Sequence, residues 1–186
     1  MRFIFKTSYD QDINLAKHAG HKVLYSMLVL ALVVAPWLLD GYWLSQLNFV
    51  LIYGIVGLGI MLLAGFTGQF SIGHAAFLGV GAYTQAVLIS HGWPFLLCLL
   101  VSAVLAAVVG VIIAMPALRL KGIYLGIATL SFGFIVEEVF ARWESVTKGN
   151  SGMAVPSPEM FGWDLNAGSG FYWVCLALAV LSTLGV

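Results

Sequence analysis

Residues 65–90 read GFTGQFSIGHAAFLGVGAYTQAVLIS, a stretch without a single Asp, Glu, Lys or Arg. It opens on Gly65, Thr67 and Gly68, where an uninterrupted apolar helix would carry Leu or Val, and it continues as a segment rich in small residues. The stretch lies inside a longer charge-free run of 78 residues, 41–118. A lipid bilayer favours such a run, because a charge at the bilayer centre costs roughly 2.5–3.5 kcal/mol on insertion scales. We therefore interpret the opening of the stretch as a polar break within a membrane domain.

The composition of the whole chain is typical of a membrane protein and argues against several other classes. Of its 186 residues, 61% are hydrophobic and 9% are charged, and the mean hydropathy is +1.01. A net charge of zero gives no basic face for nucleic acid. Cys98 and Cys175 both lie in apolar runs, so we predict buried free thiols rather than a disulfide. The sequence has no phosphate-binding loop, nucleophile elbow or metal-ligand spacing, so we expect no catalytic residue, metal or cofactor.

Six apolar segments predict an all-α, polytopic membrane protein with about six transmembrane helices. A helix needs about 20 residues to cross the hydrocarbon core of a bilayer, at about 1.5 Å per residue. The predicted spans are residues 23–39, 47–64, 73–90, 94–115, 122–140 and 171–186. The intervening loops are short, except for a long polar loop over residues 141–170. A signal peptide is the alternative for the first segment, but Ala35-Pro36-Trp37 does not resemble a cleavage site.

The distribution of Lys and Arg predicts which side of the membrane each segment faces. Residues 1–22 hold four of these residues, and the loop over residues 116–121 holds Arg119 and Lys121. Both segments lie on the same side if four spans separate them, and an excess of positive charge marks the cytoplasmic side. We therefore predict a cytoplasmic N-terminal segment over 1–22, a transmembrane domain over 23–186 and, within it, an extracytoplasmic loop over 141–170.

Three motifs in the chain resemble the permease subunits of branched-chain amino acid ABC importers, and specifically the M-type permease of the pair. They read GQFSIGHAAFLGVGAYTQAVL (68–88), LRLKGIYLGIATLSFGFIVEEVF (118–140) and VTKGNSGMAVPSP (146–158). The resemblance covers about residues 45–160 and keeps the order and spacing of all three motifs. Members of that family are usually much longer and continue into further spans and a cytoplasmic loop that docks the ATPase. The chain therefore resembles the N-terminal half of such a permease, and its transmembrane domain is expected to be partial.

The resemblance implies a function and a set of partners. It implies a permease of the bacterial cytoplasmic (inner) membrane that forms part of the translocation pathway for branched-chain or related amino acids. The implied partners are a second permease subunit, two ATPase subunits that bind the ATP, and an extracytoplasmic solute-binding protein. Arg119 and Lys121 are interpreted as anchors at the inner surface, with contact to an ATPase as the alternative. Two other functions stay open at this point: a non-transporting truncated remnant or membrane scaffold, and a permease for urea or another small polar solute.

The polar residues of the break are the candidates for the pathway or its gate: Gly65, Thr67, Gly68, Gln69, Ser71 and His74. Irregular backbone at membrane depth is tolerated where protein covers it or where it lines a cavity. We expect Gly68 to adopt a backbone conformation that a side chain would strain, and Gln69 and Ser71 to point toward the interior of the permease pair. The alternative is that these side chains bond to neighbouring helices and shape a kink. His74 in particular is interpreted as an interhelical hydrogen-bond donor, with a proton relay as the alternative.

Glu137 and Glu138 lie near the end of the fifth predicted span. An intramembrane carboxylate is a functional candidate by default. Arg142 follows Glu138 by four residues and is a natural helical partner, so the sequence favours an interfacial role for the pair of carboxylates.

The long polar loop carries a glycine-rich segment made of Lys148, Gly149, Asn150, Ser151 and Gly152. These residues are candidates for a surface that meets the solute-binding protein, and an ordinary loop is the alternative. The segment does not qualify as a phosphate-binding loop, because it neither follows a predicted strand nor has the required Lys-Ser/Thr pair.

Overall fold

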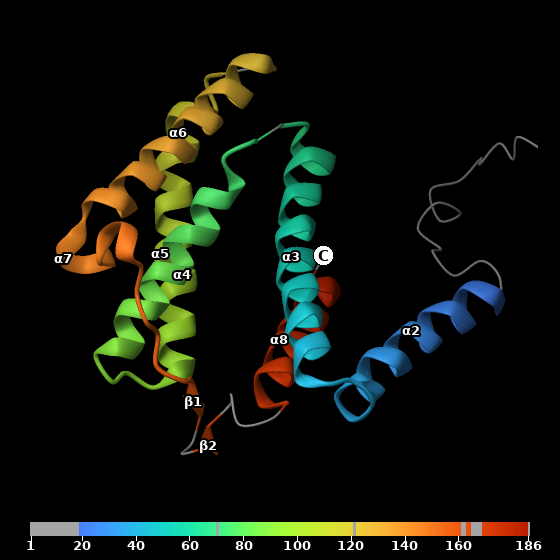
Figure 1. Ribbon diagram of the computed structural model, residues 1–186. Coiled ribbons are helices and arrows are strands. Elements are labelled where there is room, and N and C mark those ends of the chain that lie inside the picture. Colours follow the sequence, from blue (N-terminus) through green and yellow to red (C-terminus); the bar gives the residue numbers. More distant parts are fainter. Residues whose placement is uncertain (1–18, 70, 121, 161–162, 165–168, 186) are drawn as a thin grey trace, which may run out of the picture. The chain divides into compact units, whose positions relative to one another are not determined.

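The structure of the 186-residue chain is a computed structural model, which describes residues 19–69, 71–120, 122–160, 163–164 and 169–185. Its long helices are α2 (Ala19–Leu38), α3 (Gly41–Thr67), α4 (His74–Ser90), α5 (Phe95–Ala117), α6 (Ile123–Arg142) and α8 (Gly170–Leu184). A short helix α7 (Glu144–Thr147), a 3-10 turn η1 (Gly149–Ser151) and a hairpin of two-residue strands, β1 (Glu159–Met160) and β2 (Trp163–Asp164), lie between α6 and α8 (Figure 1). The predicted all-α class is confirmed, with this small hairpin as its one addition in the described residues.

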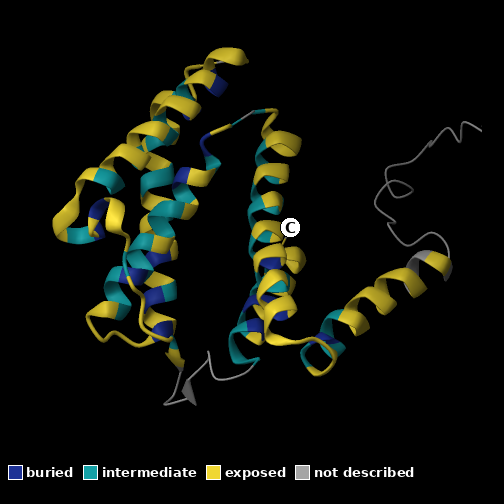
Figure 2. Cartoon of the chain, in the orientation of Figure 1, coloured by how far each residue is buried: buried dark blue, intermediate teal, exposed yellow. Residues whose placement is uncertain are grey.

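Helix length and composition identify the segments able to cross a bilayer. Within the described residues, three helices are long and apolar enough to do so: α3, α5 and α6. The apolar parts of α2 (Val23–Leu38) and α8 (Gly170–Leu184) are shorter, and α4 has 17 residues. Much of the length of these helices is exposed (Figure 2). The exposed side chains include many large apolar ones, among them Leu97, Val104 and Ile127. Such a surface fits lipid or another apolar subunit rather than water.

The described residues divide into two units. One ends at Leu44 and contains α2, in which Pro36 lies two residues before the end of the helix. The other unit, Ser45–Val186, contains most of α3 and all of the later elements. The predicted N-terminal segment over 1–22 lies mostly outside the described residues, and its last four residues belong to α2.

The predicted loop over residues 40–46 is wrong, because α3 begins at Gly41. The Leu44 N–H donates to the Asp40 carbonyl oxygen at 3.0 Å, which closes the first helical turn directly after Asp40. Nothing in the six residues that follow Gly41 breaks a helix. Tyr42 and Trp43 occupy this first turn, with their rings edge to face at 5.6 Å between centroids.

The predicted break over residues 65–72 narrows to residues 68–73, because α3 continues through Thr67. The Thr67 hydroxyl donates to the Leu63 carbonyl oxygen one turn earlier, so Thr67 belongs to the helix rather than to the break. Gly68 follows with φ +63°, the left-handed conformation that commonly ends a helix. The expectation that a side chain at Gly68 would be strained is confirmed, since this region favours glycine.

Helices α4, α5 and α6 form the packed centre of the second unit. α4 lies against α5 along most of its length and against α6 on another side. Buried side chains at these contacts include Ala76, Ala86 and Cys98. The Phe77 and Phe132 rings meet at 5.4 Å and the Tyr83 and Phe140 rings at 4.4 Å between centroids. Cys98 and Cys175 are both free and buried, as predicted.

Candidate functional site

The break between α3 and α4 is held against the second turn of α6, at Thr129. The Ile72 N–H donates to the Thr129 hydroxyl oxygen at 3.1 Å, and that hydroxyl donates to the Gly126 carbonyl oxygen at 3.0 Å. A Cβ atom at Gly73 would lie 2.1 Å from the Thr129 carbonyl oxygen, so this position requires glycine. The backbone of the break is therefore fixed to α6 both by a hydrogen bond and by direct backbone contact.

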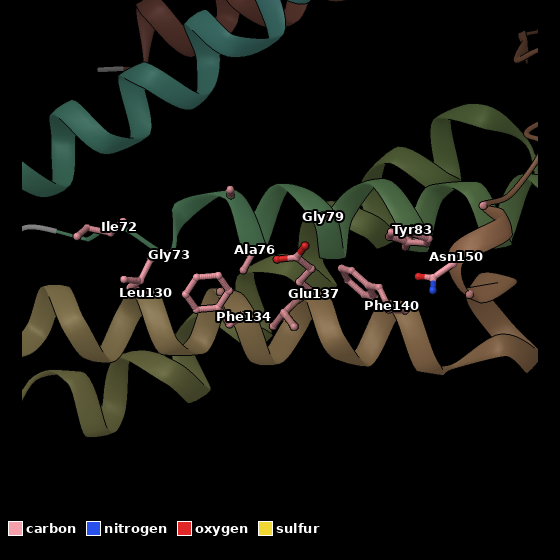
Figure 3. Close-up of a pocket in the computed structure, with 16 residues that line it drawn as sticks. Ile72, Gly73, Ala76, Gly79, Tyr83, Leu130, Phe134, Glu137, Phe140 and Asn150 are labelled. Carbon is pink, nitrogen blue, oxygen red and sulfur yellow. The ribbon is translucent and has the colours of Figure 1, made fainter.

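A cavity of about 580 Å³ runs from this anchor along the space between α4 and α6. Figure 3 shows side chains from both helices around it, with Asn150 near the segment that follows α6. The lining residues are Ile72, Gly73, Ala75, Ala76, Gly79, Tyr83, Leu130, Gly133, Phe134, Val136, Glu137, Phe140, Ala141, Gly149, Asn150 and Gly152. Most of them are small or apolar, and Glu137 is the single charged side chain in this lining.

Three segments that are far apart in the sequence meet at this cavity. They are the three motif segments 68–88, 118–140 and 146–158, which together supply every lining residue except Ala141. The motifs are thus parts of one spatial site rather than separate features of the chain.

The two neighbouring carboxylates near the end of α6, Glu137 and Glu138, have different surroundings. Glu138 forms an ion pair with Arg142 one turn later, as the spacing predicts, and both side chains are exposed. Glu137 instead lines the cavity, and its carboxylate points toward α4 near Gly79 (Figure 3). Within the described part of the chain, Glu137 has no hydrogen bond or ion pair.

The segment after α6 folds back onto the end of that helix. The Thr147 hydroxyl contacts the carbonyl oxygens of Phe140 and Trp143 at 2.6 and 2.8 Å, and the Gly149 N–H donates to that hydroxyl at 3.2 Å. The Thr147 side chain is 2% exposed. Its structural role was not predicted from the sequence. Its place directly before the glycine-rich segment was the available signal, because Thr side chains commonly bond to backbone groups at such junctions.

The glycine-rich segment 148–152 is therefore built into the site. A Cβ atom at Gly149 would lie 2.9 Å from the Ala141 carbonyl oxygen, so the segment comes into direct contact with the end of α6. Gly149 is buried, and it lines the cavity together with Asn150 and Gly152, which are exposed. Lys148 and Ser151 are exposed and lie outside the lining.

The polar residues of the break lie beside the cavity rather than in its lining. Gln69 and Ser71 are half-buried, and neither lines it. The ring of His74 packs toward α3, where a Cβ atom at Gly59 would lie 3.1 Å from its Nε2 atom, and it meets Phe77 edge to face at 6.1 Å. Gly65 and Thr67 belong to α3. The structure thus brings Glu137 and the glycine-rich segment into one cavity lining. The predicted gate residues Ser71 and His74 lie outside this lining and adjoin Ile72 and Gly73, at the opposite end of the cavity from Asn150 (Figure 3).

The cavity between α4 and α6 offers few polar side chains. Its lining offers one carboxylate, one phenol, one amide and a mostly apolar wall. In the described residues, no group of three or more His, Cys, Asp or Glu side chains could hold a metal ion.

The amino-acid sequence was compared with those of known proteins and protein families. Residues 42–185 match the family described as branched-chain amino acid transport system / permease component. The chain is 36% identical over 141 residues to the high-affinity branched-chain amino acid transport system permease protein LivM of Escherichia coli (strain K12). It is 34% identical over 142 residues to the protein of the same name in Salmonella typhimurium (strain LT2).

Each of these alignments covers 75% of this chain and 33% of the relative, so the chain spans about a third of the length of the curated relatives it matches. No solved structure matches the chain. The family match covers the cavity and all three motif segments around it. The chain therefore belongs to the family of branched-chain amino acid transport system permease components.

Proposed function

We propose that this chain forms part of the translocation pathway in an ATP-driven importer of branched-chain or related amino acids. The observation that carries the proposal is the meeting of the three motif segments around one cavity in a chain of this permease family. A permease needs a route lined by groups that suit its solute, and such sites lie between helices of a membrane bundle. The α4–α6 cavity has the size and the mixed lining expected of such a route.

The proposed complex contains a second permease subunit, two ATPase subunits and an extracytoplasmic solute-binding protein. ATP is bound and hydrolysed by the ATPase subunits, because this chain has no phosphate-binding loop. The site residues of this chain act by binding and by positioning the backbone. Gln69, Ser71 and His74 remain proposed gate residues, since they border the anchored break at the end of the cavity.

The proposed location is the bacterial cytoplasmic membrane, with the N-terminus and Arg119 on the cytoplasmic side and residues 141–170 outside. The Lys and Arg distribution supports this orientation. Labelling of single cysteines in intact cells tests it. Ser151→Cys should react with a membrane-impermeant reagent, and Arg119→Cys should react only after permeabilisation. The reverse pattern would invert the proposed topology.

Reconstitution tests the function itself. The chain is assembled with the four partner subunits in proteoliposomes. We expect ATP-dependent uptake of leucine, isoleucine and valine that requires the solute-binding protein. Uptake of urea in place of these amino acids would change the assigned solute. Correct assembly without uptake of leucine, isoleucine, valine or urea would support the scaffold alternative.

A further inference from the structure

Glu137 is an unusual residue for the wall of this cavity. It is the single charged side chain in the lining, and within the described residues no cation of the chain is paired with it. Arg142 is one turn away from Glu138 and is paired with it on the other side of α6. Glu137 lies five residues before the end of α6, about 7.5 Å along the helix axis at 1.5 Å per residue. The Glu137 side chain is exposed, so a ligand can reach it. Carboxylates within membrane-spanning helices usually pair with a cation or mark the path of one.

Three contacts hold the segments around Glu137 together. Gly73 touches the backbone at Thr129, and a Cβ atom at Gly79 would lie 3.0 Å from the Phe140 ring. The third contact is the bonding of Thr147 to the end of α6. Because these contacts fix α4, α6 and the glycine-rich segment relative to one another, the exposed Glu137 side chain borders a preformed space. A preformed site binds a ligand with less loss of conformational freedom.

The rest of the cavity lining consists of neutral polar groups and an apolar wall. Asn150 and the backbone of the glycine-rich segment supply neutral polar groups, and an amide can donate to a carboxylate. Ile72, Leu130 and Phe134 supply an apolar wall. A volume of about 580 Å³ falls in the ordinary range of roughly 300–1,000 Å³ for small-ligand pockets. One anionic group, neutral donors and an apolar wall match a small zwitterion that carries an aliphatic side chain.

We propose that the α4–α6 cavity is a transit site for amino acids in which the Glu137 carboxylate binds the ammonium group of the solute. The proposal rests on the proposed function and adds to it the residue that distinguishes an amino acid from an uncharged solute. Asn150 faces the solute carboxylate, and the apolar wall receives the aliphatic side chain. Glu138 has no part in binding, because its ion pair with Arg142 lies outside the cavity lining.

A charge-probe experiment tests the site without relying on transport. Ala75→Cys places a thiol in the cavity lining of the assembled importer, in a background with Cys98 and Cys175 replaced by Ser. The rate of modification is measured with a cationic and with an anionic methanethiosulfonate reagent. Glu137→Gln should lower the ratio of the cationic to the anionic rate at least fivefold, and Glu138→Gln should leave it within twofold. An equal effect of the two substitutions, or a thiol that reacts with neither reagent, would overturn the proposal.

Protection of the same thiol identifies the ligand class. Leucine should slow the modification at least threefold when Glu137 is present, and 4-methylpentanoate, which lacks the ammonium group, should not. The Glu137→Gln variant should lose the protection by leucine. Equal protection by the two compounds would show that the ammonium group is not recognised and would contradict the proposal.

Uptake measurements then separate this proposal from the proposed function. Glu137→Gln should lower leucine uptake at least tenfold, Glu137→Asp should recover a substantial part of it, and Glu138→Gln should stay within twofold of wild type. Membrane levels and binding-protein-stimulated ATP hydrolysis are measured in parallel, and the Asp variant guards against a simple loss of folding. A wild-type importer that does not carry amino acids would refute the proposed function. Normal leucine uptake by Glu137→Gln in an active importer would refute only the role of Glu137.

Discussion

Gly73 and Thr129 touch through their backbones, with the Thr129 carbonyl oxygen 2.1 Å from the place where a Cβ atom of residue 73 would be. We predict that Gly73→Ala destabilises the assembled permease by about 1–3 kcal/mol, because backbone cannot yield as a flexible side chain can. The thermal midpoint of the purified complex measures this loss. Gly81→Ala in α4 is the control, since nothing lies within 4 Å of its Cβ position. Equal midpoints for the two variants would contradict the close contact.

The Thr129 hydroxyl is predicted to be needed for its bond to the break rather than for its size. Thr129→Val keeps the shape but leaves the Ile72 N–H without its acceptor, at a cost of about 1–3 kcal/mol. Thr129→Ser should keep most of the stability. Ser131→Ala, at an exposed position on the same helix, should have little effect. Thermal unfolding of the three variants ranks them, and a Val variant as stable as the Ser variant would count against this role.

Thr147 is predicted to hold the glycine-rich segment against α6. Thr147→Val removes the hydroxyl that joins the Gly149 N–H to the carbonyl oxygens of α6, so the segment should open to solvent. The hydrogen-exchange rate of the buried Gly149 amide should then rise severalfold. Thr183→Val, which removes an exposed hydroxyl in α8, is the control. An unchanged rate would mean that the contacts of Gly149 alone hold the segment.

Gly68 is predicted to be essential for uptake but not for membrane insertion. A side chain at φ +63° would be strained, and valine is strained more than most residues because it is branched at Cβ. Gly68→Val should therefore abolish uptake at a normal membrane level. Gly57→Val is the control, because Gly57 has an ordinary φ and open space at its Cβ position. Gln69→Ala should lower uptake more than Leu97→Ala, and equal uptake in those two variants would make the break a simple connector.

The sequence predicted the helices well because apolar length and charge depletion are local signals. The segments of α4, α5 and α6 were predicted to within a few residues, and the prediction for Gly68 followed from glycine chemistry alone. The start of α3 was misplaced because residues 40–46 were left between two predicted spans, although Tyr42 and Trp43 already form a helical turn. The end of α3 was misplaced because the helix accommodates Gly65 and Thr67.

The site itself could be predicted only in part. Its residues come from three segments, and their meeting depends on contacts such as Gly73 with Thr129 that no local pattern contains. Glu137 and Glu138 are neighbours in sequence, but a helix turns about 100° per residue and sends them to different surfaces. The sequence alone therefore named both carboxylates but could not say which of them lines a cavity.

The contact between Phe140 and Gly79 limits which residues related proteins can carry at these two positions. A Cβ atom at Gly79 would lie 3.0 Å from the Phe140 ring, so the two positions share one limited volume. A relative with a larger residue at the position of Gly79 should carry a smaller one at the position of Phe140, and the two changes should be tolerated only together. The double substitution Gly79→Ala with Phe140→Leu should accordingly be milder than Gly79→Ala alone, which would make substitutions on α4 and α6 evolutionarily interdependent.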